Sequence, residues 1–76
     1  MITVKLYGLL RLNSGIKQRQ LEAASVKEAF TLLSREGIPL KELEGCVILL
    51  NGKNTNKRAR LADGDTLILM SPVAGG

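Results

Sequence analysis

The sequence contains no histidine, one cysteine and only two aromatic residues among its 76 positions. Without histidine, neither a Ser-His-Asp triad nor a Cys-His pair can be assembled. The single cysteine, Cys46, permits no intrachain disulfide and is too few for a structural zinc site. Because Tyr7 and Phe30 are the only aromatic residues, the core must consist mainly of leucine, isoleucine and valine. We therefore expect no metal and no bound cofactor.

Long apolar runs are also missing. No segment approaches the roughly 20 apolar residues that span a bilayer, and the first residues do not show the basic and then apolar pattern of a signal peptide. Small secreted domains usually carry several cysteines, whereas this sequence has one. We therefore expect a cytoplasmic protein that does not associate with a membrane.

Length and charge set further bounds. The chain is long enough for one small domain, which we expect to span residues 1–76, and its 45% of hydrophobic residues can supply a core. The formal net charge of +4 is compatible with an acidic protein partner or nucleic acid. A soluble surface without such a partner can have the same charge, because net charge bears on association and not on fold.

Two strands are expected near the start of the chain. From Ile2 to Tyr7, apolar residues alternate with more polar ones, which predicts a half-buried strand. The Asn-Ser-Gly sequence at 13–15 signals a turn. Residues 16–21 are rich in lysine, arginine and glutamine, which suits an edge strand that must resist pairing with other chains. These two strands are expected to form a hairpin with a long loop.

The clearest element is a helix at about 25–36. Ser25 and Glu28 form the S-x-x-E pattern of a capping box. The residues at i, i+3, i+4 and i+7 of the helix form one apolar stripe: Val26, Ala29, Phe30 and Leu33. Gly37 stands where a left-handed C-terminal cap is expected, and Pro39 prevents the helix from continuing.

Two continuous apolar runs, residues 47–50 and 67–70, predict strands in the middle of a sheet. Asn51-Gly52 signals a tight hairpin turn, after which a weaker strand is expected near 58–61. The predicted order is therefore β-β-α-β-β-β. Because one helix covers only one sheet, we expect an α+β fold of the β-grasp or ubiquitin-like type. In it, the last strand lies parallel to the first within a mixed sheet, and the helix packs across one face.

A tail at about 71–76 is expected after the last strand. Pro72 favours an extended path away from the sheet, and six extended residues reach roughly 20 Å, enough to enter a narrow channel in a partner. The sequence ends on Gly75-Gly76. A carboxylate becomes reactive only after activation, for example as an acyl-adenylate, and glycines allow close approach because they lack a Cβ. A frayed end without function is the alternative.

The tail and several shorter segments together resemble the MoaD/ThiS family of sulfur carriers, and more closely the small subunit of molybdopterin synthase. The similar parts are the ending Ser71-Pro72-Val73-Ala74-Gly75-Gly76, the Asp63-Gly64-Asp65 sequence before an apolar strand, the segment Tyr7-Gly8 with Leu10-Arg11 and Gly15, and the turn Asn51-Gly52. The resemblance covers nearly the whole chain. Its specific part is the tail with the preceding strand.

The resemblance implies a mechanism in which the chain is not an enzyme by itself. An adenylating enzyme related to ubiquitin-activating enzymes would use ATP to activate the C-terminal carboxylate of Gly76, and a sulfur donor would convert it to a thiocarboxylate. In molybdopterin synthase, such a tail enters a large subunit and delivers sulfur. The residues implied in guiding the tail or contacting partners are Met70, Pro72, Val73, Ala74 and Gly75. Met70 could equally fill a gap in the core.

Other functions remain open. A carrier of the thiamine pathway shares the Gly-Gly ending, a protein modifier would be joined through Gly76 to lysines of other proteins, and a passive β-grasp binding module would use no tail chemistry. Cys46 could be a reactive thiol, but a buried structural residue is the favoured interpretation. Asp63 and Asp65 are explained by turn formation. One set of basic residues could bind an acidic partner or form a solvated edge: Lys53, Lys57, Arg58 and Arg60. Nucleic acid is disfavoured because aromatic residues are absent from that set.

Overall fold

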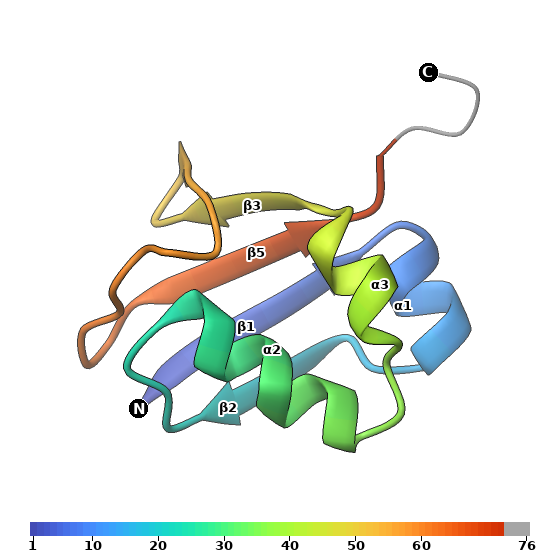
Figure 1. The fold of residues 1–76 in the computed structure, drawn as a ribbon, viewed down its shortest axis with the longest axis horizontal. Helices are drawn as coiled ribbons and strands as arrows, with labels where there is room; N and C mark the ends of the chain where they lie inside the picture. The colour runs from blue at the N-terminus through green and yellow to red at the C-terminus, as the bar shows by residue number, and fades with distance from the viewer. Residues whose placement is uncertain (73–76) are drawn as a thin grey trace.

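The computed structural model of the chain describes residues 1–72 (Figure 1). In chain order, its elements are β1 (Ile2–Tyr7), α1 (Leu9–Ser14), β2 (Gln18–Leu21), α2 (Val26–Arg35), α3 (Leu40–Glu44), β3 (Val47–Leu50), β4 (Lys53–Asn54) and β5 (Thr66–Met70). Of the predicted tail, Ser71 and Pro72 belong to the described residues.

The strands form one mixed sheet in the order β2-β1-β5-β3-β4. Strand β5 runs parallel to β1, with Leu6 opposite Leu69 and Tyr7 opposite Met70. All other neighbours are antiparallel. The three most apolar strands therefore lie in the middle, and the predicted β-grasp fold is confirmed. This topology places the end of β5, from which the tail continues, in the centre of one end of the sheet.

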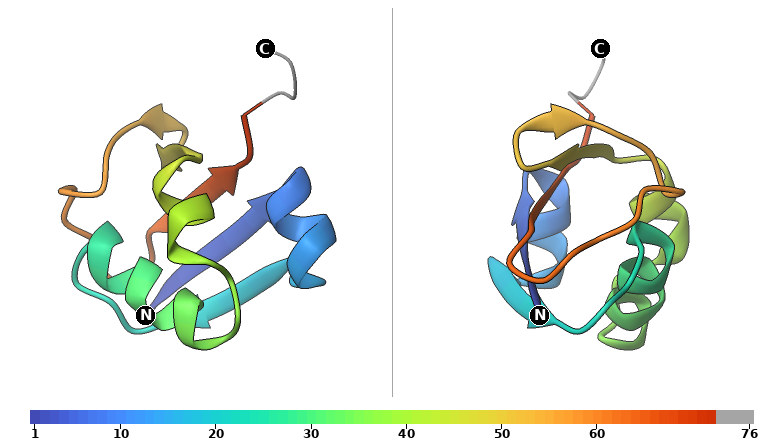
Figure 2. Two further views of the ribbon diagram at one scale, coloured as in Figure 1. Left: turned by 45° about the vertical axis from the view of Figure 1, so that its right-hand side comes forward. Right: turned by 90° about the vertical axis from the view of Figure 1, so that its left-hand side faces the viewer.

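The core lies between the sheet and helices α2 and α3, which are on the same side of it (Figure 2). The predicted apolar stripe of α2 is buried completely, and Phe30 at its centre is 1% exposed. Ser25 caps the helix as predicted, because its Oγ accepts the Glu28 N–H at 3.1 Å. The Glu28 carboxylate returns one residue further than in a regular capping box, since it accepts the N–H of Ala24 and not that of Ser25, at 3.0 Å. Sequence and structure agree on how this helix begins and which face it buries.

Two short helices were not predicted. Residues 9–14, expected in a long hairpin loop, form α1, which buries Leu10. Residues 40–44, for which no element was predicted, form α3, which buries Leu43. Pro39 stands immediately before α3, where its fixed φ suits the start of a helix. We expected a single helix to cover the sheet, and this is wrong. Helices α2 and α3 together cover one face of it (Figure 2).

The fourth strand was predicted near 58–61, and this is wrong. Asn51 and Gly52 have φ values of 50° and 87°, as a two-residue hairpin turn of type I′ requires. Such a turn pairs the residues directly beside it, so Leu50 pairs with Lys53 and β4 is formed by Lys53–Asn54. The segment 58–61 contributes only an isolated bridge between Arg60 and Ser25 at the start of α2.

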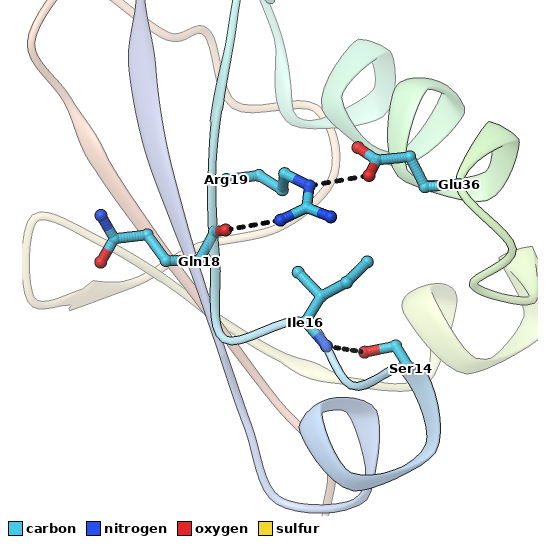
Figure 3. Close-up of polar contacts among 5 residues, drawn as sticks. All are labelled: Ser14, Ile16, Gln18, Arg19 and Glu36. Carbon is cyan, nitrogen blue, oxygen red and sulfur yellow. Dashed lines mark hydrogen bonds and ion pairs between the residues drawn. The ribbon is translucent and has the colours of Figure 1, made fainter.

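Strand β2 lies at the sheet edge, as predicted from its polar residues. The Arg19 Nε donates to Glu36 Oε1 at 2.7 Å, and the same guanidinium donates to the Gln18 carbonyl at 3.2 Å (Figure 3). The Gln18 carbonyl of this edge strand therefore already accepts a hydrogen bond from Arg19. The ion pair with Glu36 also connects Arg19 to the end of α2. Both features oppose the addition of a further strand.

The Asp-Gly-Asp segment has the structural role that the sequence predicted. Asp65 accepts the backbone N–H of Ala62 at 2.7 Å and the side-chain amide of Asn51 at 3.0 Å. The hydrogen bond from Ala62 and, to a smaller extent, the one from Asn51 hold the pKa of Asp65 below its usual range. Asp63 forms an ion pair with the amino group of Met1. The loop before β5 is thus fixed to the β3–β4 turn and to the beginning of β1.

Candidate functional site: the tail root and the open sheet face

Ser71 and Pro72, here called the tail root, follow directly on the central strand β5. Ser71 Oγ accepts the backbone N–H of Leu10 at 2.8 Å. Leu10 lies in the first turn of α1, which has no side-chain cap of its own because the N-cap residue is Gly8. The serine hydroxyl therefore supplies a cap from the far end of the chain, and it fixes where the tail leaves the domain.

Gly8 makes this contact possible. Its φ of 68° and ψ of −143° are a combination that side-chain-bearing residues rarely adopt. A Cβ at this position would also lie 3.4 Å from Ser71 Cβ. The turn from β1 into α1 and the path of the tail root therefore depend on a glycine here.

The variant Gly8→Ala is expected to lower stability by about 1–3 kcal/mol because it forces an alanine into this backbone conformation. For a domain of this size, the melting temperature should fall on the order of 10 °C. Hydrogen exchange of the Leu10 amide should become faster, since its contact with Ser71 is disturbed. The control is Gly45→Ala, where φ is −92° and the new Cβ meets only ordinary contacts. Equal melting temperatures for the two variants would contradict the argument.

The sheet face away from α2, here called the open face, carries an apolar patch beside the tail root. Side chains alternate along a strand, and Leu69 is fully buried on the core side, so Met70 points to the open face, where it is half-buried. Its neighbours across the sheet are Tyr7 and Val47, and Tyr7 is 40% exposed. The neighbouring row contains Ile68 and Leu49. Of the two interpretations of Met70, a gap-filling core residue is thus disfavoured.

Further apolar side chains are exposed on the two unpredicted helices. Leu9 and Leu12 of α1 are 50% and 76% exposed, and Leu40 of α3 is 47% exposed. A cleft between these helices reaches the tail root and is lined by Leu9, Leu10, Asn13, Glu42, Gly45, Ser71 and Pro72. Exposed apolar groups therefore accompany the tail root on both sides, as is typical of a surface that meets a partner.

Cys46 precedes β3 and is half-buried, which is less burial than the sequence predicted. Its thiol donates to the carbonyl of Leu43 at 2.8 Å. Burial raises the pKa of the thiol to about 11. Only a thiolate attacks electrophiles or accepts sulfur readily, so Cys46 is a poor candidate for sulfur chemistry at neutral pH.

Alkylation of Cys46 by iodoacetamide at pH 7.5 is expected to be about a hundredfold slower in the folded protein than in urea, because the thiolate fraction falls with the raised pKa. The rate in the folded protein should rise with pH up to about 11. Mass spectrometry of the alkylated protein gives both rates. Rates within tenfold of each other would mean that the thiol is accessible and reactive.

The predicted basic cluster is rearranged in the structure. Lys57, Arg58 and Arg60 lie together, but they line an open cleft with Lys27 of α2 and without Lys53. Lys27 joins them because backbone hydrogen bonds hold the segment 57–61 against the start of α2. We refer to this feature as the basic cleft. Segment 57–61 and the start of α2, which carry these residues, lie at the end of the sheet where β5 begins, away from the tail root (Figure 1).

The remaining predicted site residues, Val73, Ala74, Gly75 and Gly76, lie outside the described residues. Within residues 1–72, no group of three or more acidic, cysteine or histidine side chains is arranged to hold a metal ion. No helix in this part of the chain is long and apolar enough to cross a membrane.

The sequence did not predict that Ser71 caps α1 or that α1 exposes leucine side chains. Leucines at positions 9, 10 and 12 are unusual in a loop and could have indicated a short helix. The role of Ser71 had no local signal, because its partner Leu10 is 61 positions away.

Comparison with known proteins identifies the family. The ThiS family model matches residues 4–76, which includes the Gly-Gly ending. The chain belongs to the ThiS family. No curated protein matches its sequence.

Solved structures similar to this ThiS-family chain share its ubiquitin-like fold over nearly their full lengths. SAMP1 from Haloferax volcanii is 25% identical with a TM-score of 0.81, and the match covers 99% of this chain and 98% of that one. Subunits 1 and 2 of molybdopterin-converting factor from Helicobacter pylori 26695 were solved as a complex. The matched chain is 28% identical with a TM-score of 0.74, and the match covers 99% of this chain and 97% of that one. The BexX/CysO complex from Amycolatopsis orientalis gives 27% identity, a TM-score of 0.78 and full coverage of both chains.

Proposed function

We propose that the chain is a sulfur carrier whose reacting group is the C-terminal carboxylate of Gly76. The observation that carries the proposal is the family match through the Gly-Gly ending, on a chain whose last strand is central in the sheet and leads directly into the tail root. The carrier does not catalyse the reaction. Its contribution is to present the carboxylate to enzymes that do.

The chemistry proceeds in two steps on the partner enzyme. A carboxylate oxygen of Gly76 attacks the α-phosphorus of ATP, which forms an acyl-adenylate and releases pyrophosphate. A sulfur donor at the oxidation level of sulfide, such as hydrosulfide, then attacks the activated carbonyl carbon. The bond from that carbon to the AMP oxygen breaks, AMP leaves, and the new C–S bond makes the thiocarboxylate. Pro72, Val73, Ala74 and Gly75 connect the reacting end to the domain. Glycine at the end leaves the carbonyl open to attack.

The surface around the tail root supports recognition by such partners. Apolar side chains gather there on the open face, and further leucines are exposed on α1 and α3. Relatives of similar structure were solved with partner chains, namely subunit 2 of molybdopterin-converting factor and BexX. We therefore propose two partners, an adenylating enzyme related to ubiquitin-activating enzymes and the large subunit of a synthase, with molybdopterin synthesis as the pathway.

Intact mass spectrometry after incubation with ATP, the adenylating enzyme of the same host and a sulfur donor tests the proposal. We expect a mass gain equal to the replacement of one oxygen by sulfur. The gain should be lost when Gly76 is deleted and kept in the matched variant Cys46→Ala, because burial and the raised pKa of Cys46 exclude it from the reaction.

Each other outcome indicates a different function. A gain that requires Cys46 and survives deletion of Gly76 would place the sulfur on the thiol. Covalent conjugates in cells without a thiocarboxylate would identify a protein modifier. If neither sulfur transfer nor conjugates are observed, the chain is a passive binding module.

A further inference from the structure

The basic cleft has no part in the proposed sulfur chemistry, because it lies at the opposite end of the sheet from the tail root. It has a volume of about 590 Å³ and its charged and hydroxyl-bearing lining residues are Ser25, Lys27, Glu28, Lys57, Arg58 and Arg60. Four basic side chains thus face one carboxylate. A partner bound there would leave the tail and the open face accessible.

Backbone hydrogen bonds fix the positions of these basic residues. The N–H groups of Val26 and Lys27 donate to the carbonyls of Ala59 and Lys57 at 3.0 and 3.2 Å, and the Leu61 N–H donates to the Ala24 carbonyl at 3.0 Å. The segment that bears Arg58 and Arg60 is therefore fastened to the first turn of α2, beside Lys27. A surface arranged before binding loses less entropy when a partner binds.

The same arrangement is unfavourable for the isolated domain. The N-terminus of a helix is its positive end and favours anions, yet the cleft beside the N-terminus of α2 is lined by four cations. The Glu28 carboxylate accepts a hydrogen bond from the Ala24 N–H. One of the four cations, Lys57, forms an ion pair with Glu44 at 3.6 Å. Among residues 1–72, Lys27, Arg58 and Arg60 form no ion pair. The missing negative charge is best supplied by another molecule.

We propose that the basic cleft binds an acidic segment of a partner protein. Arginine guanidinium groups donate in pairs to carboxylates, and Ser25, whose oxygen accepts the Glu28 N–H, adds a hydroxyl to the lining of the cleft. Nucleic acid fits less well, because binding of single strands relies on aromatic side chains. In this chain Phe30 is buried, and Tyr7 lies at the end of β1 beside Met70. The proposal is independent of the chemistry at Gly76.

The test uses the full-length ¹⁵N-labelled protein and a ten-residue peptide of alternating glutamate and serine. Backbone amide signals of residues 24–28 and 57–61 should shift on titration, and the peptide with glutamine in place of glutamate should cause no shifts. The variant Arg58→Glu/Arg60→Glu should weaken binding at least about tenfold. The control Lys17→Glu/Lys41→Glu changes the net charge equally at exposed positions outside the cleft and should weaken it less than about threefold. If Arg58→Glu/Arg60→Glu does not fold, Arg58→Gln/Arg60→Gln replaces it.

Thermal unfolding gives a second readout. Removing cations from the positive end of α2 should leave the melting temperature unchanged or raise it, whereas a purely structural role for Arg58 and Arg60 would lower it. Equal loss of peptide binding in the two double variants, or shifts spread over the whole surface, would overturn the proposal. Tighter binding of a single-stranded oligothymidylate of equal charge to the cleft would overturn it in favour of a nucleic-acid surface.

Discussion

The variant Met70→Asp is expected to reduce adenylation of the chain about a hundredfold while the domain remains folded, as for a central residue of a binding surface. Met70 is the last residue of β5, half-buried on the open face between Tyr7 and Val47. A carboxylate there would have to lose its water when a partner covers the apolar patch, and the lysine of this face, Lys5, lies opposite Ile68 and not opposite Met70. The rate of ATP–pyrophosphate exchange at varied carrier concentration measures the effect, which should raise the KM for the carrier.

The matched control is Thr66→Asp. Thr66 lies on the same strand and the same face, but four residues, or about 13 Å, from Met70. It introduces the same charge into the same strand, so it should change kcat/KM less than about threefold. Equal activities of the two variants would show that the open face beside the tail root does not meet the adenylating enzyme. Circular dichroism of both variants separates this outcome from loss of the fold.

The variant Phe30→Ala is expected to destabilise the domain by about 3–5 kcal/mol. Phe30 is 1% exposed and is the only aromatic side chain in the core, where the other buried side chains are aliphatic. Small domains have total stabilities at the lower end of about 5–15 kcal/mol, so much of this variant should be unfolded at 37 °C. Urea denaturation followed by circular dichroism gives the free energy of unfolding.

The neighbouring substitution Thr31→Ala serves as the control for Phe30→Ala. Thr31 is exposed on the opposite side of α2, so this change should shift the free energy of unfolding by no more than about 0.5 kcal/mol. A loss below about 1 kcal/mol for Phe30→Ala would mean that the aliphatic core repacks around the missing ring.

Local patterns in the sequence determined the main elements. The apolar stripe and capping box of α2, the alternation in β1 and the continuous apolar runs of β3 and β5 all depend on residues within a few positions of one another. Because these patterns specify which faces must be buried, they also led to the strand order and to the β-grasp fold. The position of β4 was available from the same information, since a two-residue turn at Asn51-Gly52 pairs its immediate neighbours.

Only the tertiary structure decided how distant segments meet at the functional surfaces. Helix α1 is capped by Ser71 across 61 positions, and the basic cleft is completed by Lys27 because segment 57–61 pairs with the start of α2. The side of the sheet that Met70 faces follows from the pairing and packing of β5. The fold class was thus determined by the sequence itself, because it depends on local periodicity, and the chemistry proposed for the Gly-Gly ending likewise rests on residue type. The composition of each surface was decided by contacts between segments far apart in the chain, for which a local pattern carries no signal.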